Sequence, residues 1–264
     1  MNTMDGQDHW AIFLAAICGQ TYDQFLSVDG SFIVPFNFQL HYTIEAKSIN
    51  NVWERFGYIL ESPEQIIIAF RGTSTTIDWV SDMIASQKRF NYIPQDTFTH
   101  RGFTDIYASA RLGIIAALSR MSTDKSLFIT GHSLGAALAT LCAIDIAVNT
   151  PYTSPHLYTY GSPRVGDPAF SNVFKQYVQN TYRYANILDI VTHAPPSIYK
   201  LPRREKKYYY QHVQTLSSLT FANGSISANH IISSYFKELS KREPQFTESL
   251  CLANPGFCPV NVTK

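Results

Sequence analysis

One serine in the sequence is placed where it is able to act as a nucleophile. Residues 131–135 read GHSLG, after an apolar, β-like run and before an apolar, helix-like run. A sharp strand-to-helix turn lifts such a serine hydroxyl clear of a sheet, and flanking glycines let the two segments approach closely. The turn also sets the Leu134 amide at a helix N-terminus, which favours a developing oxyanion. The pattern predicts that Ser133 is a nucleophile rather than an ordinary helix-capping serine.

A serine nucleophile requires a base, and the base requires a third group that orients it. In turns of this type, the acid and then the histidine follow the serine along the chain. Asp145 lies about three turns into the predicted helix, too far from the serine. Asp167 precedes a proline, as a helix cap would. Asp189 directly follows a predicted strand and is therefore the predicted acid, the alternative being a turn-forming aspartate.

Eight histidines compete for the role of the base. His193 lies close to Asp189 on a proline-rich segment, and His212 lies within the strand-like stretch KKYYYQHVQTL. His230 ends the Gly/Ser/Asn-rich segment 222–229 and begins a predicted helix. A base on a loop that is held by a rigid element is able to move between its partners, which favours His230. His212, or a histidine that merely begins a helix, is the alternative.

Five segments together resemble the class 3 lipases, the fungal-type triacylglycerol lipase family of the α/β-hydrolase superfamily. They lie in the family's order within residues 65–200: IIIAFRGTSTTIDWVSDM, THRGFTDIY, LFITGHSLGAALATL, YTYGSPRVGDPAF and NILDIVTHAPP. The resemblance implies Ser133 as nucleophile, Asp189 as acid and His230 as base. The chain departs from the family pattern at Ala228 and Asn229, since the family usually has an acidic residue one or two positions before the histidine.

The resemblance also implies roles for the residues after Arg71. Thr73 would supply a backbone N–H, and often a hydroxyl, to an oxyanion hole shared with Leu134, and Asp82 would fix that hydroxyl. A lid at about residues 74–82 would cover the site in water and meet lipid when it opens, through Ile77, Trp79 and Val80. Without the resemblance, Thr73 reads as a turn residue, Trp79 as a core aromatic residue and Asp82 as a charge on a helix face.

The implied activity is that of a serine carboxylester hydrolase. The resemblance favours a triacylglycerol lipase that acts through an acyl-enzyme at a transient lipid-water interface, on a lipid or ester substrate and without metal or cofactor. A feruloyl-type esterase, a phospholipase, and a lipase-like binding protein without turnover are the alternatives. The basic stretch KLPRREKK, at residues 200–207, either favours anionic interfaces or is a solvated loop.

The elements that must position these residues alternate along the chain. Strand-like runs lie at 38–46, 52–60, 65–70, 126–131, 156–161 and 181–188, and helical runs lie at 103–121 and 134–148. The runs at 65–70 and 126–131 are continuously apolar, as in strands that are buried on both faces. We therefore expect an α/β-hydrolase fold, with a mostly parallel sheet flanked by helices and the site at its carboxyl edge. One domain over 1–264 is expected, with an irregular tail from about 244.

Composition gives no global preference for a charged partner, so a partner must be selected by a local site. The 264 residues are 45% hydrophobic and carry a net charge of +1, so no global field selects nucleic acid or an anionic membrane. No run approaches the roughly 18 apolar residues of a transmembrane segment. Trp10, Phe13, Leu14 and Ile17 have helical spacing, and the acidic residues beside them are unlike a signal peptide. An export signal is therefore absent or already removed, although the resemblance favours an extracellular protein.

The cysteines leave the compartment open. Cys18 and Cys142 lie in apolar helical stretches and are predicted to be buried thiols. Cys251 and Cys258 bracket the sequence LANPGF, where either a disulfide or two free thiols is possible. The sequence does not specify an oligomeric state.

Overall fold

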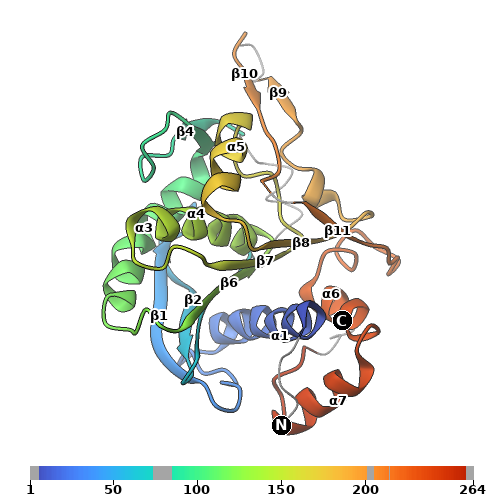
Figure 1. Ribbon diagram of the computed structural model, residues 1–264. Coiled ribbons are helices and arrows are strands. Elements are labelled where there is room, and N and C mark those ends of the chain that lie inside the picture. The colour runs from blue at the N-terminus through green and yellow to red at the C-terminus, as the bar shows by residue number, and fades with distance from the viewer. Residues whose placement is uncertain (1–5, 74–84, 201–204, 214, 260–264) are drawn as a thin grey trace.

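The computed structural model of the chain describes residues 6–73, 85–200, 205–213 and 215–259. Its central sheet has seven described strands in the order β1-β2-β3-β6-β7-β8-β11 (Figure 1). The first three strands pair antiparallel, and all the others pair parallel. The fold is that of an α/β-hydrolase. The strands are β1 (Gln39–Lys47), β2 (Trp53–Glu61), β3 (Gln65–Phe70), β6 (Ser126–His132), β7 (His156–Tyr160), β8 (Thr181–Asn186) and β11 (Leu216–Leu219).

Helices cover both faces of this sheet (Figure 1). One face carries α3 (Arg101–Leu118), α4 (Leu134–Asn149) and α5 (Pro168–Tyr177), and the other carries α1 (Gln7–Leu26) and α6 (Ile232–Ser240). The position of β3 in the sheet explains why its sequence is continuously apolar. Ile66 and Ile68 enter the core on the α4 side, whereas Ile67 and Ala69 enter the core on the α1 side. Both faces of β3 are therefore buried, as the sequence predicted.

The long elements begin and end within a few residues of the predicted bounds, and α1 forms where helical spacing predicted a helix. In the described part of the chain, no helix is long and apolar enough to cross a bilayer. The strand-like stretch KKYYYQHVQTL contains β10 (Lys207–Tyr209), but the sequence did not predict β11 or the pairing of strands into two small sheets. These sheets pair β4 (Gln87–Arg89) with β5 (Phe98–His100) and β9 (Ile198–Lys200) with β10. Strands of three or four residues are too short to show a period.

The expected irregular tail from residue 244 is wrong over its first half. Residues Pro244–Ala253 form helix α7, with the proline in the first turn, where its missing N–H costs nothing. Phe246 anchors the helix, since it is buried and stacks on His9 at 4.1 Å between ring centroids. The Pro/Gly pair that suggested irregular structure lies beyond this helix, between Cys251 and Cys258, which form a disulfide.

Candidate active site

Ser133 occupies the sharp turn between β6 and α4. Its backbone lies in a region that non-glycine residues rarely adopt, with φ 59° and ψ −126°. Two hydrogen bonds hold this conformation. The Ser133 amide donates to the Tyr160 carbonyl of β7 at 3.0 Å, and the Ser133 carbonyl accepts from the Ala136 amide at 3.0 Å. The surrounding structure therefore fixes the direction of the serine side chain.

The two glycines of GHSLG are required by the close packing of the turn. A Cβ atom on Gly131 would lie 2.2 Å from the Gly135 carbonyl oxygen. A Cβ atom on Gly135 would lie 2.2 Å from the Phe70 carbonyl oxygen on β3. Both contacts are to backbone, which is unable to move away as a flexible side chain would. Only glycine therefore fits at either position.

Asp189 and His230 form a buried hydrogen-bonded pair. His230 Nδ1 lies 2.7 Å from Asp189 Oδ2, and the same oxygen accepts the Tyr235 hydroxyl at 2.6 Å. The Val191 amide donates to Asp189 Oδ1 at 3.0 Å. Burial, and then the Asp189 carboxylate, raise the pKa of Tyr235 well above its usual range, so its hydroxyl stays protonated and donates. The carboxylate is thus held from three directions, and Nε2 is the acceptor nitrogen of His230.

His132 connects the backbone of His230 to Tyr22 on α1 through hydrogen bonds of its ring. His132 Nε2 lies 2.6 Å from the His230 carbonyl oxygen, and Nδ1 lies 2.6 Å from the Tyr22 hydroxyl. Burial, and then His230, hold the pKa of His132 well below its usual range, so this ring is neutral. A carbonyl only accepts, so Nε2–H donates and Nδ1 accepts from Tyr22. The Tyr22 oxygen in turn accepts from the Gly72 amide at 3.1 Å.

The residues expected to form an oxyanion hole lie next to Ser133. A Cβ atom on Gly72 would lie 2.9 Å from Ser133 Cβ, so the chain passes against Ser133 immediately before Thr73. Leu134 is the first residue of α4, and the first amides of a helix have no partner within it. The predicted lid residues Ile77, Trp79 and Val80, together with Asp82, lie outside the described residues.

Two polar atoms at this site are buried without a hydrogen-bond partner in the part of the chain that the structure describes. They are Oγ of Ser133 and Nε2 of His230. Ser133 is completely buried, and His230 is only 4% exposed. A buried polar atom without a partner is costly in free energy and is characteristic of functional sites. Both atoms are those that an acyl-transfer mechanism would use.

The two aspartates that the sequence argument rejected have structural roles. Asp145 is buried on α4 and accepts from the Tyr107 hydroxyl and from Arg111 Nε, each at 2.6 Å. Asp167 caps α5, because its Oδ1 accepts from the Phe170 amide at 2.7 Å. Neither carboxylate is hydrogen-bonded to a histidine within the described ranges.

The rival histidine, His212, is also held by backbone. Its Nε2 donates to the Thr192 carbonyl oxygen at 2.9 Å. Burial, and then the charge of Arg183, lower the pKa of His212 to about 3. No carboxylate is hydrogen-bonded to the His212 ring among the described residues. The arrangement required of a base, with an acid behind it, is found at His230 instead.

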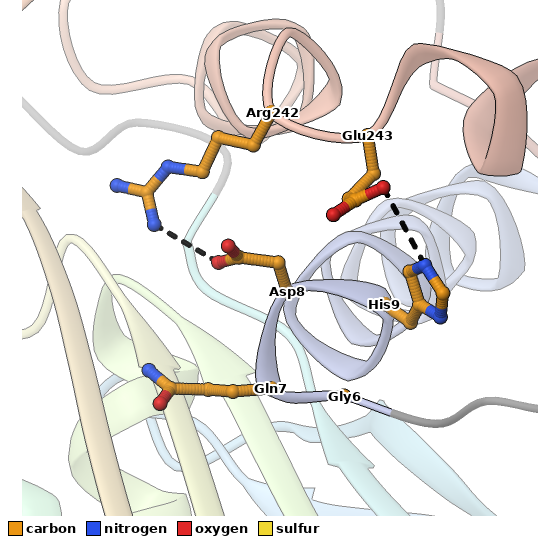
Figure 2. A pocket seen from close by; sticks show the side chains of 6 residues that line it. All are labelled: Gly6, Gln7, Asp8, His9, Arg242 and Glu243. Carbon is orange, nitrogen blue, oxygen red and sulfur yellow. Dashed lines mark hydrogen bonds and ion pairs between the residues drawn. The ribbon is translucent and has the colours of Figure 1, made fainter.

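A pocket of about 290 Å³ lies elsewhere, between the start of α1 and the junction of α6 with α7 (Figure 2). Two ion pairs cross it, Arg242 to Asp8 at 3.0 Å and His9 to Glu243 at 3.7 Å. These contacts link the first helix to the last two. None of the predicted catalytic residues lines this pocket.

The chain is similar to known proteins in sequence and in fold. The family model for lipase (class 3) matches residues 67–199, half of the chain. The chain belongs to the class 3 lipase family. The chain is 34% identical to a lipase of Rhizomucor miehei over an alignment of 159 positions, and this alignment covers 56% of the chain and 42% of that relative. It is 31% identical to Phospholipase A1-II 2 of Oryza sativa subsp. indica over an alignment of 166 positions that covers 50% of the chain and 41% of that relative.

A solved structure gives the same fold. It is a triacylglycerol lipase described as having a serine protease triad as its catalytic centre. The TM-score is 0.61 at 26% identity, covering 70% of this class 3 lipase and 73% of that chain. The chain spans less than half the length of the two curated relatives that it matches.

Three site residues were not predicted from the sequence. Tyr235 lies one turn into α6, five residues after His230, and nothing in its neighbourhood in the sequence indicates that its hydroxyl meets Asp189. Tyr22 lies on α1, and nothing in its neighbourhood in the sequence indicates that it meets His132. His132 precedes Ser133, and its ring binds the Tyr22 hydroxyl and the His230 carbonyl oxygen.

Proposed function

We propose that this class 3 lipase hydrolyses lipid carboxylic esters, as a triacylglycerol lipase working at a lipid-water interface. One observation carries the proposal, the 2.7 Å hydrogen bond from His230 Nδ1 to Asp189 Oδ2. This bond leaves Nε2 as the basic nitrogen of a histidine whose loop is tied to the residue before Ser133. The same pairing orients the base in serine hydrolases in general.

In the proposed acylation step, His230 Nε2 takes the proton of the Ser133 hydroxyl as Oγ attacks the ester carbonyl carbon. The carbonyl π electrons move onto oxygen, and the tetrahedral oxyanion is held by the amides of Thr73 and Leu134. When the oxyanion collapses, the bond to the alcohol breaks, and His230 gives its proton to the leaving alkoxide. Asp189 stays ionised throughout and stabilises the imidazolium.

In the proposed deacylation step, water replaces the alcohol. His230 takes a proton from water, whose oxygen attacks the acyl carbon, and the second oxyanion forms in the same hole. Collapse releases the fatty acid and returns the proton to Ser133 Oγ. The hydrogen bond from Tyr235 to Asp189 supports both steps, because it fixes the carboxylate that orients His230.

The substrate class is tested by comparing three esters. We expect hydrolysis of emulsified triacylglycerol and of a dissolved p-nitrophenyl ester, and little hydrolysis of methyl ferulate. The Ser133→Ala variant is the control, and it should lose both activities. A purified, folded protein that hydrolyses none of these esters would support a lipase-like binding protein instead.

A phospholipase is the second candidate, because one relative is named Phospholipase A1-II 2. Mixed micelles of phosphatidylcholine distinguish the two candidates. Release of fatty acid from phosphatidylcholine faster than from triacylglycerol would favour the phospholipase.

A further inference from the structure

We propose that the β9–β10 hairpin is a docking surface for anionic lipid membranes. The docking face consists of Ile198 and Lys200 of β9 and of Lys207 and Tyr209 of β10. The proposal goes beyond ester hydrolysis, because it concerns a surface and not the catalytic residues. In Figure 1 the hairpin projects from the body of the molecule.

The register of the hairpin brings these four residues to one face. Lys200 pairs with Lys207, and Ile198 pairs with Tyr209. Side chains alternate between the faces of a strand, so the two pairs share a face that Tyr199 and Tyr208 do not. Ile198 is 57% exposed and Tyr209 is 49% exposed. The docking face thus has a row of two lysines next to a row of two apolar side chains.

The opposite face anchors the hairpin to the protein. Tyr199 and Tyr208 pack with Ala85 and Tyr210. The Tyr210 hydroxyl donates to the Ala85 carbonyl oxygen at 3.1 Å. Because the hairpin is fixed through this face, the docking face is directed away from the protein.

The docking face is not arranged for stability of the hairpin. Like charges directly opposite each other in a sheet are destabilising, and Lys200 and Lys207 are such a pair. Within the described ranges, neither lysine forms an ion pair, whereas three lysines elsewhere do: Lys88, Lys125 and Lys241. One exposed carboxylate, Glu205, precedes β10, and the adjacent Lys206 offsets its charge. The face therefore keeps a local positive charge that an anionic partner would neutralise.

The apolar row selects a lipid surface among anionic partners. Tyrosine and lysine are both favoured at the boundary between headgroups and hydrocarbon, where the lysine ammonium reaches the phosphates. An exposed isoleucine gains free energy when it enters hydrocarbon, which a nucleic acid does not offer. Further exposed isoleucines and leucines lie next to the catalytic residues. Ile187, Leu188 and Ile190 flank Asp189, and Ile231 follows His230.

Vesicle sedimentation tests this proposal. The full chain carrying Ser133→Ala, which leaves the lipid intact, is mixed with vesicles of phosphatidylcholine alone or with about 30% phosphatidylglycerol. We expect the anionic vesicles to bind about tenfold or more tightly, and the difference to shrink when salt rises from about 0.1 M to about 0.5 M. Equal binding to both kinds of vesicle would overturn the proposal.

A matched pair of variants separates the docking face from net charge. K200E/K207E should reduce binding to anionic vesicles to the level seen with phosphatidylcholine. R120E/K237E makes the same change in net charge at two exposed positions outside the hairpin and should bind as the parent does. An equal loss in both variants would contradict a local docking face. Circular dichroism of each variant checks that it is folded.

Two further arms complete the experiment. If a duplex DNA binds through Lys200 and Lys207 while anionic vesicles do not, the partner is a nucleic acid and the proposal is wrong. Hydrolysis of a dissolved ester by the unmutated chain is measured separately. Its absence would contradict the proposed function without affecting the test of the docking face.

Discussion

The turn that holds Ser133, at residues 131–135, and the loop that holds His230, at residues 222–230, are fixed by different kinds of interaction. Ser133 is held by backbone packing between consecutive elements, since Gly131 and Gly135 leave no space for a Cβ atom. His230 is held by side chains that are distant in the sequence. Asp189 binds its ring, and Asn186 Nδ2 donates to the Asn229 carbonyl at 3.2 Å. Local sterics therefore position the proposed nucleophile, and tertiary hydrogen bonds position the proposed base.

This difference predicts whether a substitution in each region reduces stability or catalysis. A change in the turn should affect the whole fold, because the turn joins β6 to α4 in the middle of the sheet. A change in the loop at residues 222–230 should affect catalysis more than stability, because residues 222–227 are exposed. The following variants test the contrast.

The largest effect is expected for Gly135→Ala. The added Cβ atom would lie 2.2 Å from the Phe70 carbonyl oxygen, so α4 would have to move away from β3. We expect a loss of about 3 kcal/mol or more in the free energy of unfolding, measured by urea denaturation, or no folded protein. Gly224→Ala is the control, since a Cβ atom there has no neighbour within 4 Å and only its positive φ opposes the change. Equal stability of the two variants would contradict the steric account.

His230→Ala should remove catalysis and leave the fold. Loss of the base lowers kcat by about 10⁵- to 10⁶-fold in serine hydrolases, because the hydroxyl is then not activated. The urea midpoint should change little by comparison. His212→Ala is the matched control and should keep most of the activity. An inactive His212→Ala beside an active His230→Ala would show that the base was assigned to the wrong residue.

Tyr235→Phe should have an intermediate effect on catalysis. It removes a 2.6 Å hydrogen bond to Asp189 Oδ2. A hydrogen bond to a charged group is worth about 1.5–3 kcal/mol, so we expect kcat to fall by about 10- to 100-fold with KM nearly unchanged. Tyr58→Phe removes a buried hydroxyl that donates to the Ile17 carbonyl and should reduce stability without reducing kcat. Similar kcat values in the two variants would mean that Tyr235 has only a structural role.

The smallest effect of a single substitution is expected in the pH dependence of stability. Burial lowers the pKa of His100 to about 4 and is also the main cause of the low pKa of His212. Below pH about 6.5 the unfolded chain therefore binds more protons than the native chain, so the free energy of unfolding falls with falling pH. The slope is about 1.4 kcal/mol per pH unit for each such histidine.

Urea denaturation at several values between pH 7 and pH 5 measures this slope. His100→Asn should reduce the slope by the contribution of one histidine, because asparagine is able to cap α3 and does not titrate in this range. Stability that is constant over this range would contradict the neutral, buried state of these rings.

The sequence was sufficient where one short segment contains the physical cause. The alternation of strand-like and helical runs predicted the mostly parallel sheet. Strands β3 and β6 are buried on both faces, as their continuously apolar composition predicted. The strand, serine and glycines of residues 126–135 predicted the turn. The sequence was insufficient where the cause is a contact between distant segments. Tyr22 lies 110 residues from His132, and Tyr235 lies 46 residues from Asp189.

The central claim is that Ser133 is the nucleophile and that His230 activates it. Labelling with an organophosphonate, followed by mass spectrometry of the intact chain and its peptides, tests this claim most directly. The account predicts one adduct on Ser133 that accompanies loss of ester hydrolysis, no adduct in Ser133→Ala, and much slower labelling in His230→Ala. An adduct on another serine, or full inactivation without modification of Ser133, would contradict it.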